Sequence, residues 1–463
     1  MLLGYPQPNF RETEMPSITN YRRGHGLGLA LGEASPTVRR GFFRYPTTAV
    51  ERFLLMMISV LLPLQNHIPS VAGFSIIYIL FAILAGYVFL KRTRALGRTW
   101  LHPVFLAAYA WLSVSLSMES LHPYPDYSSI LRIGQALAGA IVVASLCRDR
   151  RALQAAIYGC LVAGLWMSVL LFFSSFGALS GATATSFKEA TNLRGQVFAE
   201  SPLESNPNFM GFIAAQGTVV ALALALTTRS AHRRFLFLGI TALCFVATFL
   251  PLSRSAIVIV ILACGAIMLA YGAKHIRTLM VAVILGATMV IWVPDAVFSR
   301  LTFSTEPDHG KLEGRARIYT AVIEHLPEYA MTGVGVGNFN GPWGMQTEFF
   351  KPSQGIVLGA HNWYFAVTIY WGVGGLLALL AMLYQAYRCL PKRCGVDPLS
   401  LCVLGLAATL FLFTLVQHVL ADKSVFLGIG LLVGARLWIW PHSIVQSGLR
   451  QQRRFRIPLR HTS

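Results

Sequence analysis

The sequence has few charged residues. Only 12% of its 463 residues are Asp, Glu, Lys or Arg, whereas 55% are hydrophobic and the mean hydropathy is +0.58. A soluble domain has about 25% charged residues, and a nucleic-acid-binding protein needs a water-facing surface for its basic residues. The composition therefore excludes both classes and predicts a polytopic membrane protein.

The chain also lacks two features that many exported proteins have. Residues 1–49 hold no apolar run typical of a cleavable signal peptide, so the first span is expected to act as the insertion signal. This segment is rich in Arg, Gly and Pro and is expected to be a disordered cytoplasmic tail. None of the seven cysteines lies in a segment predicted to face outward, so no exported disulfide framework is expected.

The apolar runs predict an all-α bundle. A helix that crosses a bilayer needs about 20 mostly apolar residues. Twelve runs meet this expectation: 50–65, 70–90, 101–117, 128–147, 153–178, 208–227, 233–250, 254–272, 278–294, 362–388, 398–417 and 424–440.

These spans divide the chain into segments. Nine spans are predicted in residues 50–294, with an outer loop at 179–207, and three more in residues 358–440. A long outer loop that contains helices is predicted at 295–357, and a basic cytoplasmic tail at 441–463. Loops as long as the two outer ones are usually functional.

The distribution of basic residues predicts the orientation. With both termini in the cytoplasm, 28 of the 38 Lys and Arg residues fall on the cytoplasmic side. That side then carries a net charge of +22 and the outer side −3. Loops rich in basic residues stay on the cytoplasmic side of a membrane, so this charge distribution agrees with cytoplasmic termini. Shifting the map by one span would put most of the basic residues outside.

Polar residues gather at the predicted outer ends of even-numbered spans. Intramembrane polar residues are costly and are functional candidates by default. The group comprises Arg132, Asn206-Pro207-Asn208, Ser253-Arg254-Ser255, His361-Asn362, His418 and Asp422-Lys423. These ends are helix N-termini, where free N–H groups and the helix dipole attract anions. Arg132, Arg254 and Lys423 add positive charge there, so the sequence predicts an outward-facing anion site. The planar guanidinium of arginine contacts two oxygens at once, which suits phosphate.

The two outer loops carry further cations. Arg194 precedes Asn206-Pro207-Asn208, which is itself a turn and helix-cap signal. In the second loop, residues 314–326 are typical of an amphipathic helix, on which Arg315 and Arg317 are about 200° apart, so one of the two is expected to be solvated. The following Gly333-Val334-Gly335-Val336-Gly337 has no strand before it and no GKS/T after it, so it predicts a tight structural turn rather than a nucleotide loop.

His361 is the candidate proton acceptor. It is the rim residue whose ordinary pKa, about 6.5, suits proton transfer near neutral pH. A single histidine is more often a capping or interfacial residue, so its significance depends on the arginines near it.

Taken together, these motifs resemble the O-antigen ligase family of bacterial inner-membrane glycosyltransferases. The resemblance covers roughly residues 50–440. It rests on the order of the motifs: Arg194, Asn206-Pro207-Asn208, Ser253-Arg254-Ser255, Gly314-Arg315, the glycine run to Asn338-Phe339, and His361-Asn362 with Tyr364 and Gly372 to Gly375. Tyr319 is a departure, since relatives commonly have Trp there.

The resemblance implies a membrane glycosyltransferase C fold and a reaction at the periplasmic face. The enzyme would transfer a polysaccharide from undecaprenyl diphosphate to the core sugar of lipid A. It implies that His361 is catalytic and that Arg194, Arg254 and Arg315 bind the donor diphosphate. Secondary candidates are Arg132, Asn208, Asn362, Arg317, His418 and Lys423. Arginines and helix N-termini can stabilise the diphosphate charge without a metal or another cofactor, and the partners would be the lipid-linked donor, the lipid A-core acceptor and membrane lipids, without nucleic acid.

Three alternatives remain open at this stage. An O-antigen polymerase or a protein O-oligosaccharyltransferase shares such motifs. A transporter of lipid-linked sugars is disfavoured because the spans hold no Asp or Glu between their ends, whereas ion-coupled transporters commonly carry acids near the midplane. A non-catalytic scaffold would not require the cluster of rim arginines.

Overall fold

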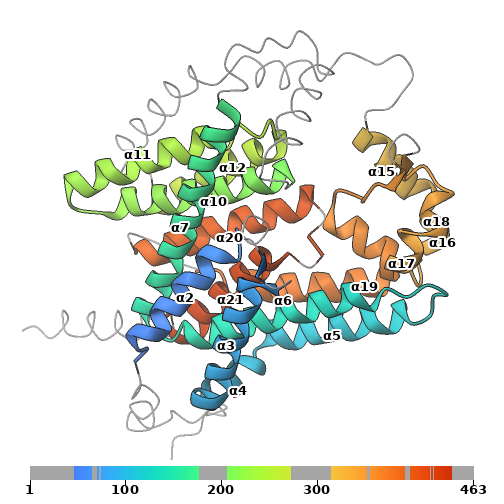
Figure 1. Ribbon diagram of the computed structural model, residues 1–463, viewed down its shortest axis with the longest axis horizontal. Coiled ribbons are helices and arrows are strands. Elements are labelled where there is room, and N and C mark those ends of the chain that lie inside the picture. Colours follow the sequence, from blue (N-terminus) through green and yellow to red (C-terminus); the bar gives the residue numbers. More distant parts are fainter. Residues whose placement is uncertain are drawn as a thin grey trace, which may run out of the picture. The chain divides into compact units, whose positions relative to one another are not determined.

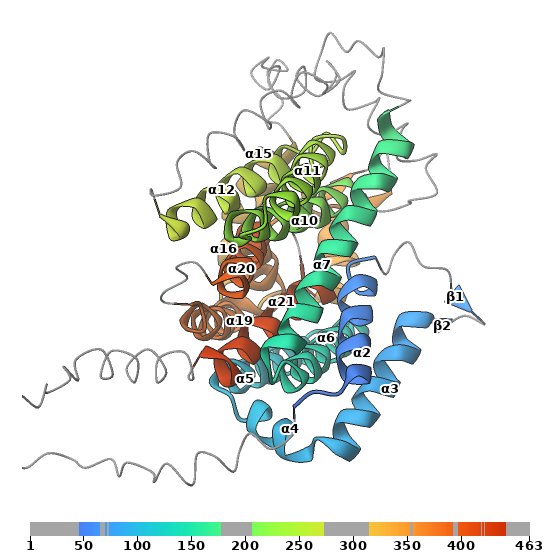
Figure 2. The same cartoon turned by 90° about the vertical axis from the view of Figure 1, so that its left-hand side faces the viewer.

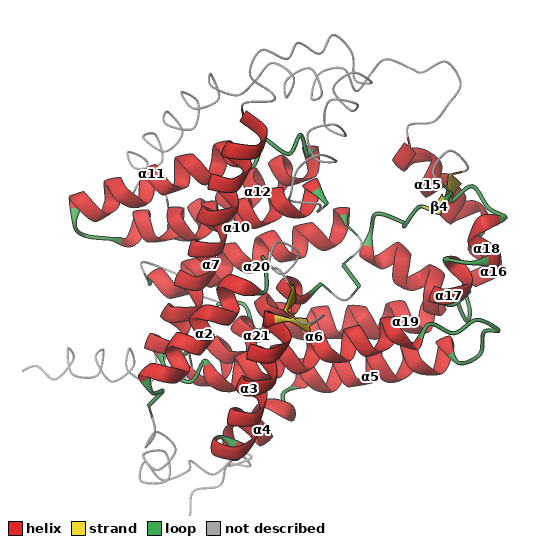
Figure 3. Ribbon diagram, viewed as in Figure 1, coloured by secondary structure: helices red, strands yellow, loops and turns green. Residues whose placement is uncertain are grey.

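The computed structural model describes residues 46–64, 70–71, 74–176, 206–272, 314–351, 355–391, 397–417, 419–420 and 422–440. The chain divides into two units, Met1–Pro46 and Thr47–Ser463, and all that follows concerns the second. Its described part consists almost entirely of α-helices (Figure 3), with two short hairpins.

The helices follow the order of the predicted apolar runs. The N-terminal half holds α2 (Ala49–Leu61), α3 (Ile76–Lys91), α4 (Thr93–Trp100), α5 (Pro103–Glu119), α6 (Tyr127–Leu146), α7 (Arg150–Leu171) with the π-helical turn η2 (Phe172–Phe176), α10 (Pro207–Thr227), α11 (Ala231–Ala247) and α12 (Arg254–Tyr271). The remainder holds α15 (Gly314–Glu324), α16 (Leu326–Tyr329), α17 (Val336–Phe339), α18 (Pro342–Met345), α19 (Trp363–Arg388), α20 (Pro398–Val416) and α21 (Lys423–Trp438). Strands β1 (Ser70–Val71) and β2 (Phe74–Ser75) pair antiparallel, as do β3 (Phe350–Lys351) and β4 (Ile356–Val357).

Six described helices are long and apolar enough to cross a membrane, and the bent pair of α4 and α5 brings the number to seven. The six are α6, α7 with η2, α10, α12, α19 and α20. Helices also occupy the other predicted runs, except residues 278–294, which lie outside the described residues. An all-helical membrane protein is therefore confirmed, whereas the count of twelve spans stays a prediction.

One short helix was not expected. Residues 91–98 were predicted as a basic inner loop, but α4 forms there and meets α5 at an angle of 67°. Pro103 occupies the first position of α5, where its missing N–H costs nothing, and His102 caps that helix. The proline therefore begins a new helix instead of continuing α4.

Several helices far apart in the sequence pack side by side (Figure 1). Helices α11 and α12 both lie against α10, while α5 runs along α19. Helix α2 lies against α7 in both views (Figures 1 and 2), and α20 contacts α10 and α12.

One end of the bundle is held by ionic and polar pairs, and we call it the ion-pair end. Arg92 at the end of α3 donates two hydrogen bonds to the Glu51 carboxylate in α2, and Arg150 in α7 pairs with Asp397, the N-cap of α20. The Asp149 carboxylate, which caps α7, accepts hydrogen bonds from the Thr47 backbone and hydroxyl at 2.7 and 2.5 Å. All these residues were predicted to lie on the same side of the membrane, so the contacts agree with that grouping.

Helix α19 is broken near its middle, where a single uninterrupted span was predicted. Trp371 and Gly372 leave helical geometry, and Gly372 has a φ of +65°. The loop segment 330–335 binds this break: the Val334 and Gly335 N–H groups donate to the Ile369 and Tyr370 carbonyls, and Val373 N–H donates to the Ala330 carbonyl. A Cβ on Gly333, which has a φ of +77°, would overlap the Tyr370 carbonyl. The glycine run is thus a structural turn, as its sequence predicted.

Helices α7 and α10 pack through a pair of glycines. A Cβ on Gly217 would lie 2.9 Å from the Gly164 Cα, and one on Gly164 would overlap the Gly217 backbone. Small residues allow this close approach, which is a common way for helices to associate in membranes. Most of α10 is buried by its neighbours.

We therefore expect Gly164→Ala to lower the thermal unfolding midpoint of the detergent-purified protein by several degrees, because the added methyl forces α7 and α10 apart. The control is Gly239→Ala in α11, where the structure leaves open space around the new Cβ. Equal midpoints for the two variants would contradict the glycine contact.

Candidate functional site

The N-terminal ends of α10 and α12 are joined by a chain of polar side chains. Asn206 caps α10 and Ser253 caps α12. The Ser253 hydroxyl donates to the Asn208 side-chain oxygen at 2.8 Å, and the Asn208 amide donates to the Gln417 side-chain oxygen at 3.3 Å. Gln417 follows the last residue of α20, so the starts of two helices meet the end of a third.

The start of α19 meets the same end of α20. Asn362 caps α19 by accepting from the Phe365 N–H at 3.1 Å, and its amide donates to the Leu415 carbonyl at 2.8 Å. The Tyr364 hydroxyl lies 3.2 Å from the Thr414 hydroxyl. We call Asn206, Asn208, Ser253, Asn362 and Gln417 the cap cluster.

The cap cluster lies at the opposite end of α20 from the ion-pair end. Helix α20 has 19 residues, which corresponds to a length of about 28 Å. This length is close to the roughly 30 Å hydrocarbon thickness of a bilayer. The two polar ends are therefore separated by about one membrane thickness.

Arg254 and His361 adjoin the cap cluster. Arg254 is the first residue of α12, directly after Ser253, and it is partly buried. His361 directly precedes Asn362 and has a φ of +49°. Leu252, which directly precedes Ser253, has a φ of +53°. The chain thus enters α12 and α19 through residues in left-handed geometry, which non-glycine residues adopt at functional or tightly constrained sites.

Of the secondary candidates, Asn208 and Asn362 are members of the cap cluster. Lys423 is the first residue of α21, whose N-cap Asp422 accepts from the Ser424 and Val425 N–H groups. Burial raises the pKa of the Asp422 carboxyl to about 6. Arg132 differs from these residues: it is exposed on α6 and donates to the Ser128 hydroxyl one turn earlier on the same helix.

The other candidates are described in part or not at all. Arg194 and His418 lie outside the described residues. Arg315 and Arg317 belong to α15, where the structure describes the backbone at their positions. Tyr319, one helical turn after Arg315, packs edge-to-face on Phe365 in the first turn of α19, with ring centroids 5.3 Å apart. This contact places α15 beside the start of α19.

Glu119 is a central residue that the sequence analysis did not single out. Its side chain is fully buried at the end of α5. The carboxylate accepts hydrogen bonds from the Asp126 N–H at 2.7 Å, the Val336 N–H at 2.9 Å and the Trp371 indole at 2.9 Å. One carboxylate therefore fixes the start of α6, the start of α17 and the break in α19. The only sequence signal was an acidic residue directly after an apolar run.

A second cluster that the sequence analysis missed lies on the loop between α15 and α19. The His325 ring lies 2.7 Å from the Glu328 carboxylate and 2.8 Å from the Glu348 carboxylate. The Trp343 indole donates to Glu328 at 3.0 Å. The hydrogen bond to Glu328, reinforced by Glu348, raises the pKa of His325 above its usual value, so the cluster stabilises the charged imidazole.

The described residues contain no group of three or more His, Cys, Asp and Glu side chains suited to hold a metal ion. The loop residues Glu306, Asp308 and His309 lie outside the described residues. What the described arrangement offers chemically is a set of helix N-termini that meet one end of α20, with Arg254 directly after the cap Ser253 and His361 directly before the cap Asn362.

Residues 239–380 match the family model described as O-antigen ligase. The family resemblance predicted from the sequence is thereby confirmed over a segment that includes Arg254, Arg315, Arg317, His361 and Asn362. Together with the apolar helices, the match identifies a multi-pass membrane protein. No curated protein matches the chain.

The Glu119 contacts predict a large effect of Glu119→Gln. An amide nitrogen cannot accept the hydrogen bonds that the carboxylate oxygen accepts, so at least one buried N–H loses its partner, at a cost of about 1–3 kcal/mol in the free energy of unfolding. Glu324→Gln, at an exposed position of α15, removes the same charge and should change stability by less than about 0.5 kcal/mol. Thermal unfolding of both variants measures the difference, and a Glu119→Gln midpoint equal to that of the control would show that the carboxylate does not hold the loop.

Proposed function

Because residues 239–380 match the O-antigen ligase family model, we propose that the chain is a membrane glycosyltransferase that joins O-antigen polysaccharide to lipid A-core oligosaccharide. The donor is the polysaccharide linked to undecaprenyl diphosphate. The site is the cap cluster with its flanking residues, at the periplasmic face of the bacterial inner membrane, in a fold of the membrane glycosyltransferase C type.

One observation carries this proposal: the starts of α10, α12 and α19 meet at one end of α20. This arrangement brings the helix that begins with Arg254 and the helix that follows His361 to the same end of α20. Helix N-termini favour anions through their free N–H groups and dipoles, and an arginine adds a fork that fits phosphate oxygens. The geometry supports a site for a diphosphate leaving group beside a candidate base.

The proposed reaction is a single displacement. The acceptor hydroxyl attacks the anomeric carbon of the donor as the bond between that carbon and the diphosphate oxygen breaks, which inverts the configuration. His361 accepts the hydroxyl proton. Arg254, with Arg194 and Arg315 from the two loops, stabilises the negative charge that develops on the diphosphate. The charge is balanced by protein cations in this scheme, so the proposal includes no metal.

The backbone of α15 supports the assignment of Arg315. The contact between Tyr319 and Phe365 holds α15 beside the first turn of α19, and Arg315 stands one turn before Tyr319. Asn208 and Asn362 act as positioning residues, because their amides fix the helix starts. Arg317, Arg132, His418 and Lys423 remain secondary candidates.

His361→Ala should lower ligation by about 10²–10⁴-fold, because a general base contributes about that factor. The assay combines purified protein, an undecaprenyl-diphosphate-linked glycan and lipid A-core, and it measures glycan on the lipid A-core. His232→Ala, in an exposed position of α11, is the control and should keep full activity. Full ligation by correctly inserted His361→Ala would refute the proposed base. Lengthening of the lipid-linked glycan with no transfer to lipid A-core would identify a polymerase instead.

Arg254→Lys should weaken donor binding by about tenfold, since lysine keeps the charge but loses the two-pronged contact with phosphate oxygens. Arg233→Lys is the matched control, because Arg233 is exposed on α11. Donor titration of the inserted proteins gives the two affinities. An unchanged affinity for Arg254→Lys would exclude bidentate recognition of the diphosphate by this residue.

A further inference from the structure

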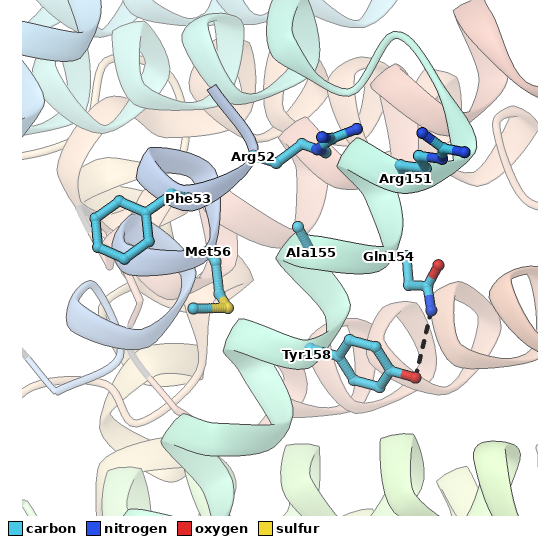
Figure 4. Close-up of a pocket in the computed structure, with 7 residues that line it drawn as sticks. All are labelled: Arg52, Phe53, Met56, Arg151, Gln154, Ala155 and Tyr158. Atoms are coloured by element: carbon cyan, nitrogen blue, oxygen red, sulfur yellow. Dashed lines mark hydrogen bonds between the residues drawn. The ribbon is translucent and has the colours of Figure 1, made fainter. Parts of the chain in front are cut away.

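A groove of about 320 Å³ lies between α2 and α7 near the ion-pair end. Arg52 and Arg151 stand at one end of it, and Met56, Ala155 and Tyr158 continue it along the two helices (Figure 4). Residues four apart on a helix share one face, so Arg52 with Met56 on α2 and Arg151 with Ala155 on α7 line the same groove. The groove is therefore a stripe of apolar surface with two guanidinium groups at its head.

The floor of the groove is set by close packing of the two helices. A Cβ on Gly159 of α7 would lie 2.6 Å from the Met56 carbonyl oxygen of α2. Below this contact the helices are too close for a ligand, and toward their N-termini they leave the groove open. Phe53 on its edge is 57% exposed and lies in the first predicted membrane span. The groove thus opens to the side where lipid would be.

The arginines lie at the N-terminal ends of the two helices, where the topology predicted from the sequence puts the lipid headgroups. Arg52 is in the first turn of α2 and Arg151 in the first turn of α7. The neighbouring Arg150 pairs with Asp397 at the N-terminal end of α20, and the length of that helix puts this end about 28 Å from the cap cluster. This is the membrane surface opposite the site proposed above, so the groove is a separate site.

The charge balance of this end favours an external anion. The described acids at this end already have partners within the chain. Glu51 pairs with Arg92, and Asp149 accepts from Thr47 and from the start of α7. Asp397 pairs with Arg150 and accepts from the start of α20. The chain's own N-terminal segment is an unsuitable occupant, because residues 1–45 carry six arginines against three glutamates. Two guanidinium groups above an apolar stripe instead match a phosphate above an acyl chain.

We propose that this groove binds one anionic phospholipid of the surrounding membrane. The phosphate lies between Arg52 and Arg151, and an acyl chain follows Met56, Ala155 and Phe53. The bound lipid adds contacts between α2 and α7 at an end where the groove interrupts their packing. This site does not depend on the catalytic assignment above.

The test is binding of phosphatidylglycerol with a fluorescent acyl chain to the full-length protein in an uncharged detergent, with phosphatidylcholine of the same chain length as comparison. The wild-type protein should bind phosphatidylglycerol preferentially. Each arginine near a headgroup contributes about a fivefold change in affinity, so Arg52→Gln with Arg151→Gln should weaken binding on the order of 20-fold. Ala155→Trp fills the groove without changing the charge and should also abolish preferential binding.

The matched control is Arg229→Gln with Arg233→Gln, which removes the same charge from an exposed position between α10 and α11 and from another in the first turn of α11. Its affinity should stay within about twofold of the wild type. An equal loss in this control, or unchanged binding in Ala155→Trp, would overturn the proposal in favour of diffuse attraction to basic loops. If the double Gln variant fails to insert, Arg52→Lys with Arg151→Lys keeps the charge that orients the helices, and unchanged binding there would overturn recognition by the guanidinium forks.

Discussion

The constraint on which the site depends is that helix ends in a membrane must have their backbone groups satisfied. The first N–H groups of a helix have no partner within it, and in lipid each unsatisfied group costs several kcal/mol. In this chain Asn206, Ser253 and Asn362 satisfy the first turns of α10, α12 and α19. Asn208 and Asn362 also donate to groups at the end of α20. The need to satisfy three helix starts therefore brings the starts together, and Arg254 and His361 come with them.

Much of this arrangement was accessible from the sequence. Apolar runs located the helices because a membrane span has to be apolar for about 20 residues. The polar residues at the starts of even-numbered spans stood out against that background, and they include four helix caps of the structure: Asn206, Ser253, Asn362 and Asp422. The basic loops lie at the opposite ends of these spans, and this alternation predicted which helix ends share a side of the membrane. The pairs Glu51–Arg92 and Arg150–Asp397 agree with that prediction.

What the sequence could not indicate are contacts over long separations. Glu119 binds Val336 and Trp371, which are 217 and 252 positions away, and nothing in its neighbourhood in the chain points to either partner. The break in α19 was equally hidden, because Trp371 and Gly372 fit an apolar helix by composition. Only the loop that donates and accepts hydrogen bonds across the break makes the interruption favourable. The convergence at the cap cluster likewise depends on Gln417 and Leu415, of which neither had a distinctive local pattern.

The break in α19 has a mechanical consequence. The segment from Trp363 to Tyr370 is a rod of about 12 Å. Its start, next to His361, is bonded to the end of α20 through Asn362, and its other end is held by the loop and by the indole bond of Trp371 to Glu119. The remainder of α19 runs along α5. A movement of the loop would therefore be transmitted along this short rod to the helix start beside the histidine, while the longer part of α19 stays in place against α5.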